Sequence, residues 1–171
     1  MFKVIIVNGY PRAGKDTFVN FIIELVDCKV IEHSTIAFSK YIAELMGWNG
    51  IKSIHSREML SDLKAFANKW FDKSFKDMTH LIEHNYQKDV FVVFHIREPK
   101  EIERISKWCK KRSINIKTVF INGDRSEINQ TNDSDLNVDN YKYDIYINNN
   151  GTLKDYKNKI KICLDSISRT I

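Results

Sequence analysis

Two glycines and a lysine near the beginning of the sequence have the spacing of a phosphate-binding loop. Four residues separate Gly9 from Gly14, and Lys15 follows directly, within the stretch GYPRAGKDTF at 9–18. Glycines at these positions let the backbone turn tightly, so that successive N–H groups point inward and form a nest for an anion. A lysine beside such a nest supplies a positive charge for the β and γ phosphates of a nucleotide. The pattern therefore predicts that the chain binds a nucleotide through its phosphates.

Asp16 stands where a phosphate-binding loop ordinarily has a serine or a threonine. The usual hydroxyl binds Mg²⁺, and a carboxylate is a charged oxygen ligand that can replace it. The hydroxyl of Thr17 is the next candidate, for the metal or for the α phosphate. We expect Asp16, Thr17 or both to bind the metal, although the helix dipole alone also favours an acid in a first helical turn. The expected nucleotide contacts are Gly9, Arg12, Ala13, Gly14, Lys15, Asp16 and Thr17.

The residues around this loop predict that it joins a strand to a helix. Residues 3–8 (KVIIVN) contain consecutive apolar side chains, as in a parallel strand that helices cover on both faces. A helix is expected at about 14–27, because apolar residues recur there on one helical face. A G-x-x-x-x-G-K match that lies between a strand and a helix arises by chance much less often than the sequence pattern by itself.

Strands and helices are expected to alternate along the rest of the chain. This order predicts an α/β fold with a parallel sheet and helices on both faces, in which ligands bind beyond the carboxyl ends of the strands. A polar segment of about twenty residues at 122–141 is long enough to act as a lid. The further strands are expected at 29–33, 89–96, 114–121 and 144–147, a helical insertion at about 35–87, and a last helix that buries Leu153, Tyr156, Ile160, Cys163, Leu164 and Ile167.

Composition excludes several classes of protein. Hydrophobic residues make up 43% of the 171-residue chain, but no apolar stretch approaches the roughly 20 residues that a membrane span needs. We expect one domain over residues 1–171, in the cytoplasm, with three reduced cysteines. The net charge of +5 suits an anionic ligand. Because the basic residues are dispersed and no aromatic RNA-binding signature is present, we expect no stable nucleic-acid partner. A homodimer is left open.

The loop and several later stretches resemble phage-type deoxynucleoside monophosphate kinases, whose loop likewise carries G-K-D-T. The resemblance covers nearly the whole chain and implies a P-loop nucleoside monophosphate kinase fold. That fold has a five-stranded parallel sheet, a helical insertion that binds the monophosphate, and a lid loop. It also implies a viral or prophage origin. The later stretches are IAFSKYIAELMGW at 36–48, REMLSDLKAFANKW at 57–70, IREP at 96–99 and DNYKYDIYINNNGTL at 139–153.

The resemblance implies functions for four cations and for a nucleotide pocket. Arg97, directly after the third expected strand, would meet the acceptor phosphate or the transferring group, and Arg125 resembles the lid arginine. Arg57 and Lys64 lie seven residues apart on one side of the insertion helix, so both can project toward a monophosphate. A solvated side chain or a salt bridge is the alternative for each cation outside the loop. The expected pocket residues are Phe38 and Ser39.

His95 stands two residues before Arg97, where the family often has an acidic residue that can serve the metal. We expect His95 to be a buried, hydrogen-bonded histidine rather than a ligand. Its presence removes the obvious second acidic ligand and therefore shifts the expected metal binding onto Asp16.

These observations together predict ATP-dependent phosphoryl transfer to a (deoxy)nucleoside monophosphate, with ATP and Mg²⁺ as cofactors. Lys15, Arg97 and Arg125 are the expected catalytic residues, because positioning and charge neutralisation supply most of the catalysis in phosphoryl transfer. One alternative is another small-molecule kinase, since animal-type phosphomevalonate kinases share a G-K-D loop. The other is a non-catalytic nucleotide- or nucleic-acid-binding protein, which the basic charge and His95 would suit. The sequence does not identify the base or the sugar of the acceptor.

Overall fold

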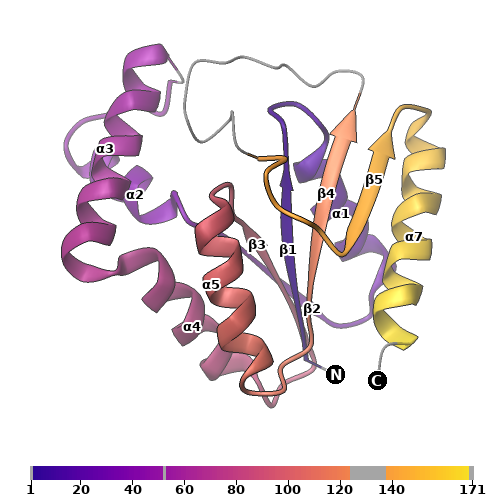
Figure 1. Ribbon diagram of the computed structural model, residues 1–171. Helices are drawn as coiled ribbons and strands as arrows, with labels where there is room; N and C mark the ends of the chain where they lie inside the picture. The colour runs from indigo at the N-terminus through magenta and orange to yellow at the C-terminus, as the bar shows by residue number, and fades with distance from the viewer. Residues whose placement is uncertain (1, 52, 124–137, 170–171) are drawn as a thin grey trace.

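A computed structural model describes residues 2–51, 53–123 and 138–169 (Figure 1). In these residues all strand pairings are parallel, and the strands form one sheet in the order β2-β3-β1-β4-β5. The expected five-stranded parallel sheet is therefore confirmed. The strands are β1 (Lys3–Gly9), β2 (Lys29–Ser34), β3 (Val90–His95), β4 (Ile116–Gly123) and β5 (Ile145–Asn149).

Helices cover both faces of this sheet. Side chains alternate along β1, so that Val4 and Ile6 face α4 and α5, whereas Ile5 and Val7 face α1 and α7. Because both faces are dry, the central strands carry continuous apolar runs instead of an alternating pattern. The helices are α1 (Lys15–Leu25), α2 (Ala37–Leu45), α3 (Ile54–Phe71), α4 (Lys73–Asn85), α5 (Pro99–Lys110) and α7 (Leu153–Arg169).

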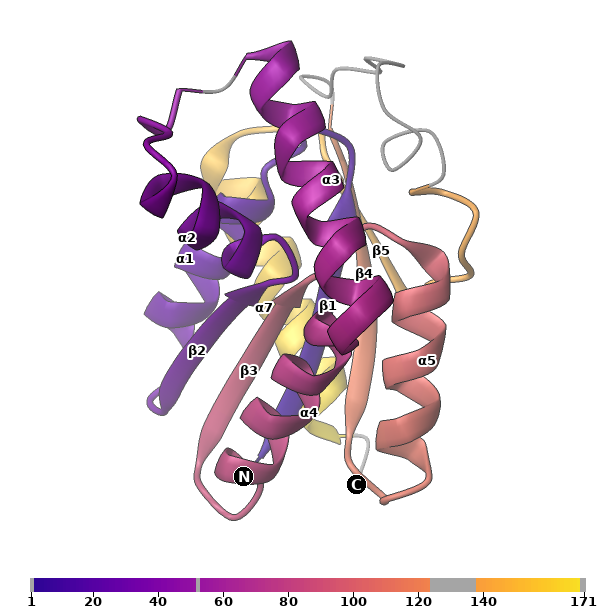
Figure 2. The same cartoon turned by 90° about the vertical axis from the view of Figure 1, so that its left-hand side faces the viewer.

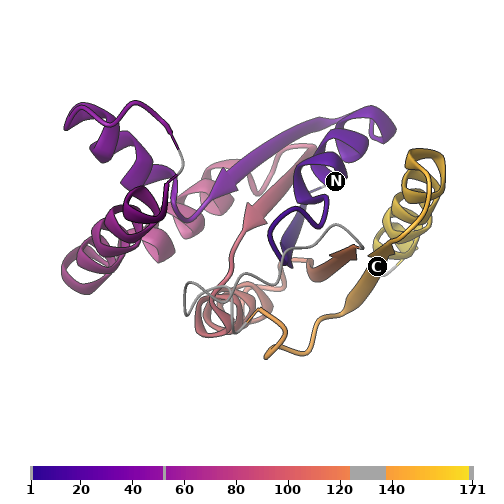
Figure 3. The same cartoon turned by 90° about the horizontal axis from the view of Figure 1, so that it is seen from above.

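The connection from β2 to β3 contains α2, α3 and α4, as the expected helical insertion requires. Figures 2 and 3 show α2 and α3 beyond the β2 side of the sheet, on the opposite side from α7. A capping box begins α3, in which the Ser53 hydroxyl accepts from the Ser56 N–H and the Ser56 hydroxyl accepts from the Ser53 N–H. Arg104 on α5 pairs with Asp72 at 2.6 Å and ties the α3–α4 junction to α5.

One expectation about the last helix is wrong. Leu153 was expected on the buried face of α7, but its side chain is 68% exposed. The residue begins the helix just after the carboxyl end of β5, about one turn before the buried face of α7. The buried face begins at Tyr156, which is 1% exposed.

The carboxyl ends of β1, β3 and β4 lie at the same edge of the sheet (Figure 1). The expected lid loop falls mainly on 124–137, outside the described residues, and so does Arg125. None of the helices in the described part of the chain is both long and apolar enough to cross a bilayer.

The burial of β1 predicts that alanine substitutions at two isoleucines lower the free energy of unfolding by very different amounts. Ile6 is fully buried in the central strand, whereas Ile23 on α1 is 53% exposed. We expect Ile6→Ala to lower the free energy of unfolding by about 3 kcal/mol, because it removes a buried side chain and leaves a cavity, and Ile23→Ala to lower it by less than about 1 kcal/mol. Urea denaturation measures both values, and equal losses would contradict this arrangement of the core.

Candidate functional site

The loop after β1 has the backbone geometry of a phosphate-binding loop. Gly9 and Gly14 have φ angles of 148° and 100°, which glycine adopts without strain. A Cβ atom on Gly9 would lie 2.1 Å from the carbonyl oxygen of Ile121 on β4, and one on Gly14 would lie 2.5 Å from Nδ2 of Asn149. Gly9 therefore packs too closely on the backbone of β4 for a side chain, and Gly14 requires glycine because of its φ angle.

Lys15 begins α1 and folds back over the loop. Its Nζ donates to the carbonyl oxygens of Gly9 and Tyr10, both at 2.7 Å. Gly14 caps the helix without a side-chain hydrogen bond, so no side chain of the cap residue competes for the first N–H groups of α1. The lysine charge and the positive end of the helix dipole thus coincide at one place, which is the arrangement that binds phosphate.

Two residues near the end of the chain hold this loop in place. The amide of Asn149 donates to the carbonyl oxygen of Ala13 at 3.1 Å, and the hydroxyl of Tyr156 donates to that of Gly14 at 3.0 Å. Burial raises the pKa of the Tyr156 hydroxyl, so it remains a donor at all physiological pH values. Sequence reasoning placed Tyr156 only in the core. The signal it missed is that a buried tyrosine hydroxyl needs a partner.

Asn8 connects the loop to the connection after β3. This side chain is 1% exposed, and its amide donates to the carbonyl oxygen of Arg97 at 3.1 Å and to the hydroxyl of Tyr143 at 2.8 Å. The Tyr143 hydroxyl donates in turn to the carbonyl oxygen of Val138 at 2.6 Å. The backbone of Arg97 is therefore fixed beside the loop at the carboxyl edge, as predicted, and its side chain is exposed there.

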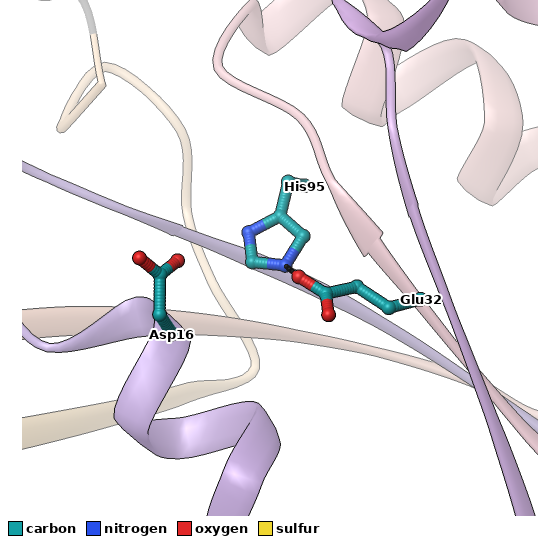
Figure 4. Close-up of side chains that lie close together, drawn as sticks. All are labelled: Asp16, Glu32 and His95. Carbon is teal, nitrogen blue, oxygen red and sulfur yellow. Dashed lines mark ion pairs between the residues drawn. The ribbon is translucent and has the colours of Figure 1, made fainter.

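A group of three side chains at this edge was only partly foreseen. Asp16 on α1, Glu32 on β2 and His95 at the end of β3 each offer a ligand atom, and these atoms lie within 4.8 Å of one another. Figure 4 shows the imidazole ring between the two carboxylates. Sequence reasoning did not single out Glu32, because only the pairing of β2 with β3 brings it beside His95.

His95 is largely buried, as expected, and its ring contacts one carboxylate. Its side chain is only 14% exposed, and Nε2 lies 2.7 Å from Oε1 of Glu32. This contact is short enough for an ion pair when the ring is protonated, and Nε2 has no other polar partner among the residues that the structure describes. Burial lowers the pKa of His95, although the carboxylates of Glu32 and Asp16 act in the opposite direction. Burial therefore favours the neutral form of the ring.

Three of the residues expected to bind the acceptor lie around one hollow. Phe38, Ser39 and Lys64 line one hollow between β2 and the helices α2, α3 and α4. The Ser39 hydroxyl oxygen is buried without a hydrogen-bond partner in the described part of the chain. Arg57 is exposed on α3 and does not line the hollow. The remaining lining residues are His33, Thr35, Ala67, Asn68, Lys73, Ser74 and Asp77.

Lys64 is engaged by two carboxylates. Its Nζ lies 2.7 Å from Glu98 and 3.1 Å from Glu101, and it donates to the hydroxyl of Thr35 at 3.0 Å. Burial alone would raise the pKa of Glu98, but the Lys64 ammonium outweighs it and the pKa is lowered. For Glu101, burial together with the charge of Glu98 outweighs Lys64 and raises the pKa to about 7. The binding of substrate by Lys64 remains a prediction.

Neither a protein-family model nor a curated protein sequence matches this chain. Solved structures do share its fold. An APS kinase of Mycobacterium tuberculosis in complex with AMPPNP and APS matches with a TM-score of 0.59 and 9% identity, over 95% of this chain and 97% of that chain. A putative kinase from Chloroflexus aurantiacus matches with a TM-score of 0.54 and 15% identity, over 96% of each chain.

A shikimate kinase from Aquifex aeolicus matches with a TM-score of 0.51 and 12% identity, over 98% of this chain and 99% of that chain. At these identities the likeness concerns the fold alone. The fold is that of the P-loop kinases, and the likeness extends over nearly the full length of each chain.

The raised pKa of Glu101 predicts that the free energy of unfolding depends on pH. Its pKa rises from 4.5 to about 7 on folding. A raised carboxyl pKa means that the folded state holds the proton more tightly, so stability is lost as the pH rises from about 4.5 through about 7. Glu101→Gln removes this loss. We subtract the free energy of unfolding of the unmodified chain from that of the variant. We expect this difference to increase by about 1–3 kcal/mol from pH 5 to pH 8.

Urea denaturation at the two pH values measures this change. Glu83→Gln, at an exposed position on α4, is the matched control and should show no such pH dependence. A difference for Glu101→Gln that is the same at pH 5 and pH 8 would contradict the raised pKa.

Proposed function

We propose that this chain is a kinase that transfers the γ phosphate of ATP to a (deoxy)nucleoside monophosphate and so forms the diphosphate. The observation that carries the proposal is the phosphate loop at the carboxyl edge of a P-loop kinase sheet, where Lys15 lies 2.7 Å from the carbonyl oxygens of Gly9 and Tyr10. Ligands of parallel α/β sheets bind at this edge. The likeness to kinases of small molecules supports the class of reaction.

ATP would bind with its β and γ phosphates over the loop. The N–H groups from Ala13 to Thr17 and the Lys15 ammonium would stabilise the negative charge, which is greatest on the transferring phosphoryl group and the leaving oxygen. Arg12, with a φ angle of 61°, lies in the same loop and is expected to contact the nucleotide.

The residues present fit a divalent cation beside these phosphates. The Asp16 carboxylate is exposed at the start of α1 and makes no hydrogen bond or ion pair with another residue in the described part of the chain. Asp16 and the hydroxyl of Thr17 would hold Mg²⁺, which is a hard cation that prefers oxygen ligands. When bound, the ion would neutralise charge on the phosphates of ATP.

The acceptor would bind on the β2–β3 side of the loop. Arg97 would contact its phosphate or the transferring group, while Phe38 and the unpartnered hydroxyl of Ser39 would contact the nucleoside. The oxygens of a monophosphate are already nucleophilic, so direct in-line transfer needs no general base. Positioning the two phosphates is then the main task of the protein.

A second candidate is a kinase for another small molecule. The ion pairs of Lys64 with Glu98 and Glu101 favour it, because they leave this lysine less available to an acceptor phosphate. Phosphomevalonate, APS and shikimate are the acceptors to compare with the monophosphates. A non-catalytic nucleotide-binding protein would bind ATP and transfer phosphate to none of them.

A panel of the common ribo- and deoxyribonucleoside monophosphates, together with these three compounds, tests the assignment. We expect ADP formation that depends on at least one monophosphate. Lys15→Ala should lower kcat/KM at least about 100-fold, because it removes a preorganised charge from the transferring group. Lys29→Ala, at an exposed position at the start of β2, is the control. Full activity of Lys15→Ala, or transfer only to a compound outside the monophosphates, would refute the proposal.

Arg97 tests the acceptor side separately. We expect Arg97→Ala to lower kcat/KM for the monophosphate by about 100-fold, since an arginine on a phosphate provides charge-assisted hydrogen bonds, while the affinity for ATP changes little. Arg112→Ala, at an exposed position after α5, should behave as the unmodified chain does. A nucleotide titration without acceptor separates the two effects, and a large loss of ATP binding would reassign Arg97 to the nucleotide.

A further inference from the structure

Three segments that are distant in the sequence bring two carboxylates and an imidazole to one place. Asp16 is the second residue of α1, Glu32 lies within β2, and His95 is the last residue of β3. Their ligand atoms lie within 4.8 Å of one another, and the three side chains face one another in Figure 4. The phosphate loop and Lys15 immediately precede Asp16, so the group borders the site expected for the nucleotide phosphates.

These side chains do not satisfy one another. Like charges oppose the approach of the Asp16 and Glu32 carboxylates, and within the described ranges no lysine or arginine pairs with either of them. Nε2 of His95 lies 2.7 Å from Oε1 of Glu32, which is close enough for an ion pair, and has no other polar partner among the residues that the structure describes. In Figure 4 the imidazole ring lies between the two carboxylates, and a bound cation would balance their negative charges. The group therefore has the charge and the ligand types of a cation site.

We propose that Asp16, Glu32 and His95 together bind one divalent cation. Two ligands of an ion at bond lengths of roughly 2.1 Å lie about 3.0 Å apart when adjacent and about 4.2 Å apart when opposite in an octahedron. The observed separations, from 2.7 Å for the His95–Glu32 contact to at most 4.8 Å, come close to this range. The exposed Asp16 and Glu32 side chains can close the remainder by small rotations.

The ligand types favour a first-row transition cation over Mg²⁺. Mg²⁺ takes oxygen ligands and keeps several of its waters, whereas an imidazole nitrogen suits transition cations, which bind the same set of ligands more tightly. Two carboxylates with one imidazole therefore predict a site that prefers Mn²⁺ and its heavier neighbours. Glu32 then supplies an acidic ligand in place of the one that the resembled family often has at the position of His95.

Only the role of this cation rests on the proposed function. In a kinase the cation would neutralise phosphate charge beside Lys15. Asp16 would then belong both to the phosphate loop and to the metal site. Cation binding itself requires neither ATP nor turnover, so it can be measured on the protein alone.

Electron paramagnetic resonance of Mn²⁺ titrated with nucleotide-free protein tests the site. We expect one bound Mn²⁺ per chain and at least tenfold weaker binding of Mg²⁺ in competition. Asp16→Asn and Glu32→Gln should each weaken Mn²⁺ binding at least about tenfold. His95→Gln, which keeps a polar side chain of similar size, should in addition reduce the preference for Mn²⁺ over Mg²⁺.

Matched controls come from exposed residues outside the cluster, with Glu44→Gln on α2 and His80→Ala on α4 expected to bind Mn²⁺ as the unmodified chain does. Circular dichroism identifies any variant that fails to fold. Unchanged Mn²⁺ binding in all three site variants, with normal ADP formation, would overturn the metal site and leave the proposed kinase function intact. Loss of Mn²⁺ binding in variants of a chain that transfers no phosphate would support the site and remove the proposed function.

Discussion

The parallel pairing of β1 with β3 on one side and with β4 on the other is the constraint on which the whole site depends. In this register Val7 lies opposite His95, and Gly9 lies opposite Ile121. All three strands therefore end at one edge, and the loop after β1 packs against the backbone of β4 with no room for a Cβ atom on Gly9. The dry faces on both sides of β1 hold this register, because a slip by one residue would exchange the two buried sets of side chains.

Hydrogen bonds from buried and partly buried side chains hold the loop after β1 in place between the strands. Asn8 joins the loop to the connections after β3 and before β5, and Asn149 and Tyr156 hold two of the loop carbonyls from the other side. These hydrogen bonds lie in a low-dielectric environment, where breaking one leaves an unpaired polar group at considerable cost. A phosphate site benefits from such rigidity, because N–H groups that are already oriented need no reorganisation when the charge arrives.

Two residues depart from the expected patterns, and the structure places them in one group. Asp16 stands where a phosphate-binding loop ordinarily has a hydroxyl, and His95 stands where the resembled family often has an acid. Glu32, on the strand next to His95, lies 2.7 Å from that ring. Acidic groups are thus still gathered beside the loop, although the second one comes from β2 and not from the end of β3, where the resembled family often has it. A metal site built in this way would retain its charge while exchanging one oxygen ligand for nitrogen.

The sequence by itself determined the sheet, the loop and the helical insertion. Strand β1 was expected at 3–8 and lies at Lys3–Gly9, and the helical insertion was expected at about 35–87 and contains α2, α3 and α4 between Ala37 and Asn85. These elements could be predicted because dry strands need continuous apolar residues and a glycine loop needs glycines at set positions, both of which are local properties. Only the tertiary structure decided that Glu32 meets His95, that Lys64 pairs with Glu98 and Glu101, and that Asn149 and Tyr156 support the loop. Each of these contacts joins residues more than thirty positions apart, and their meeting depends on strand order and helix placement, which no local pattern encodes.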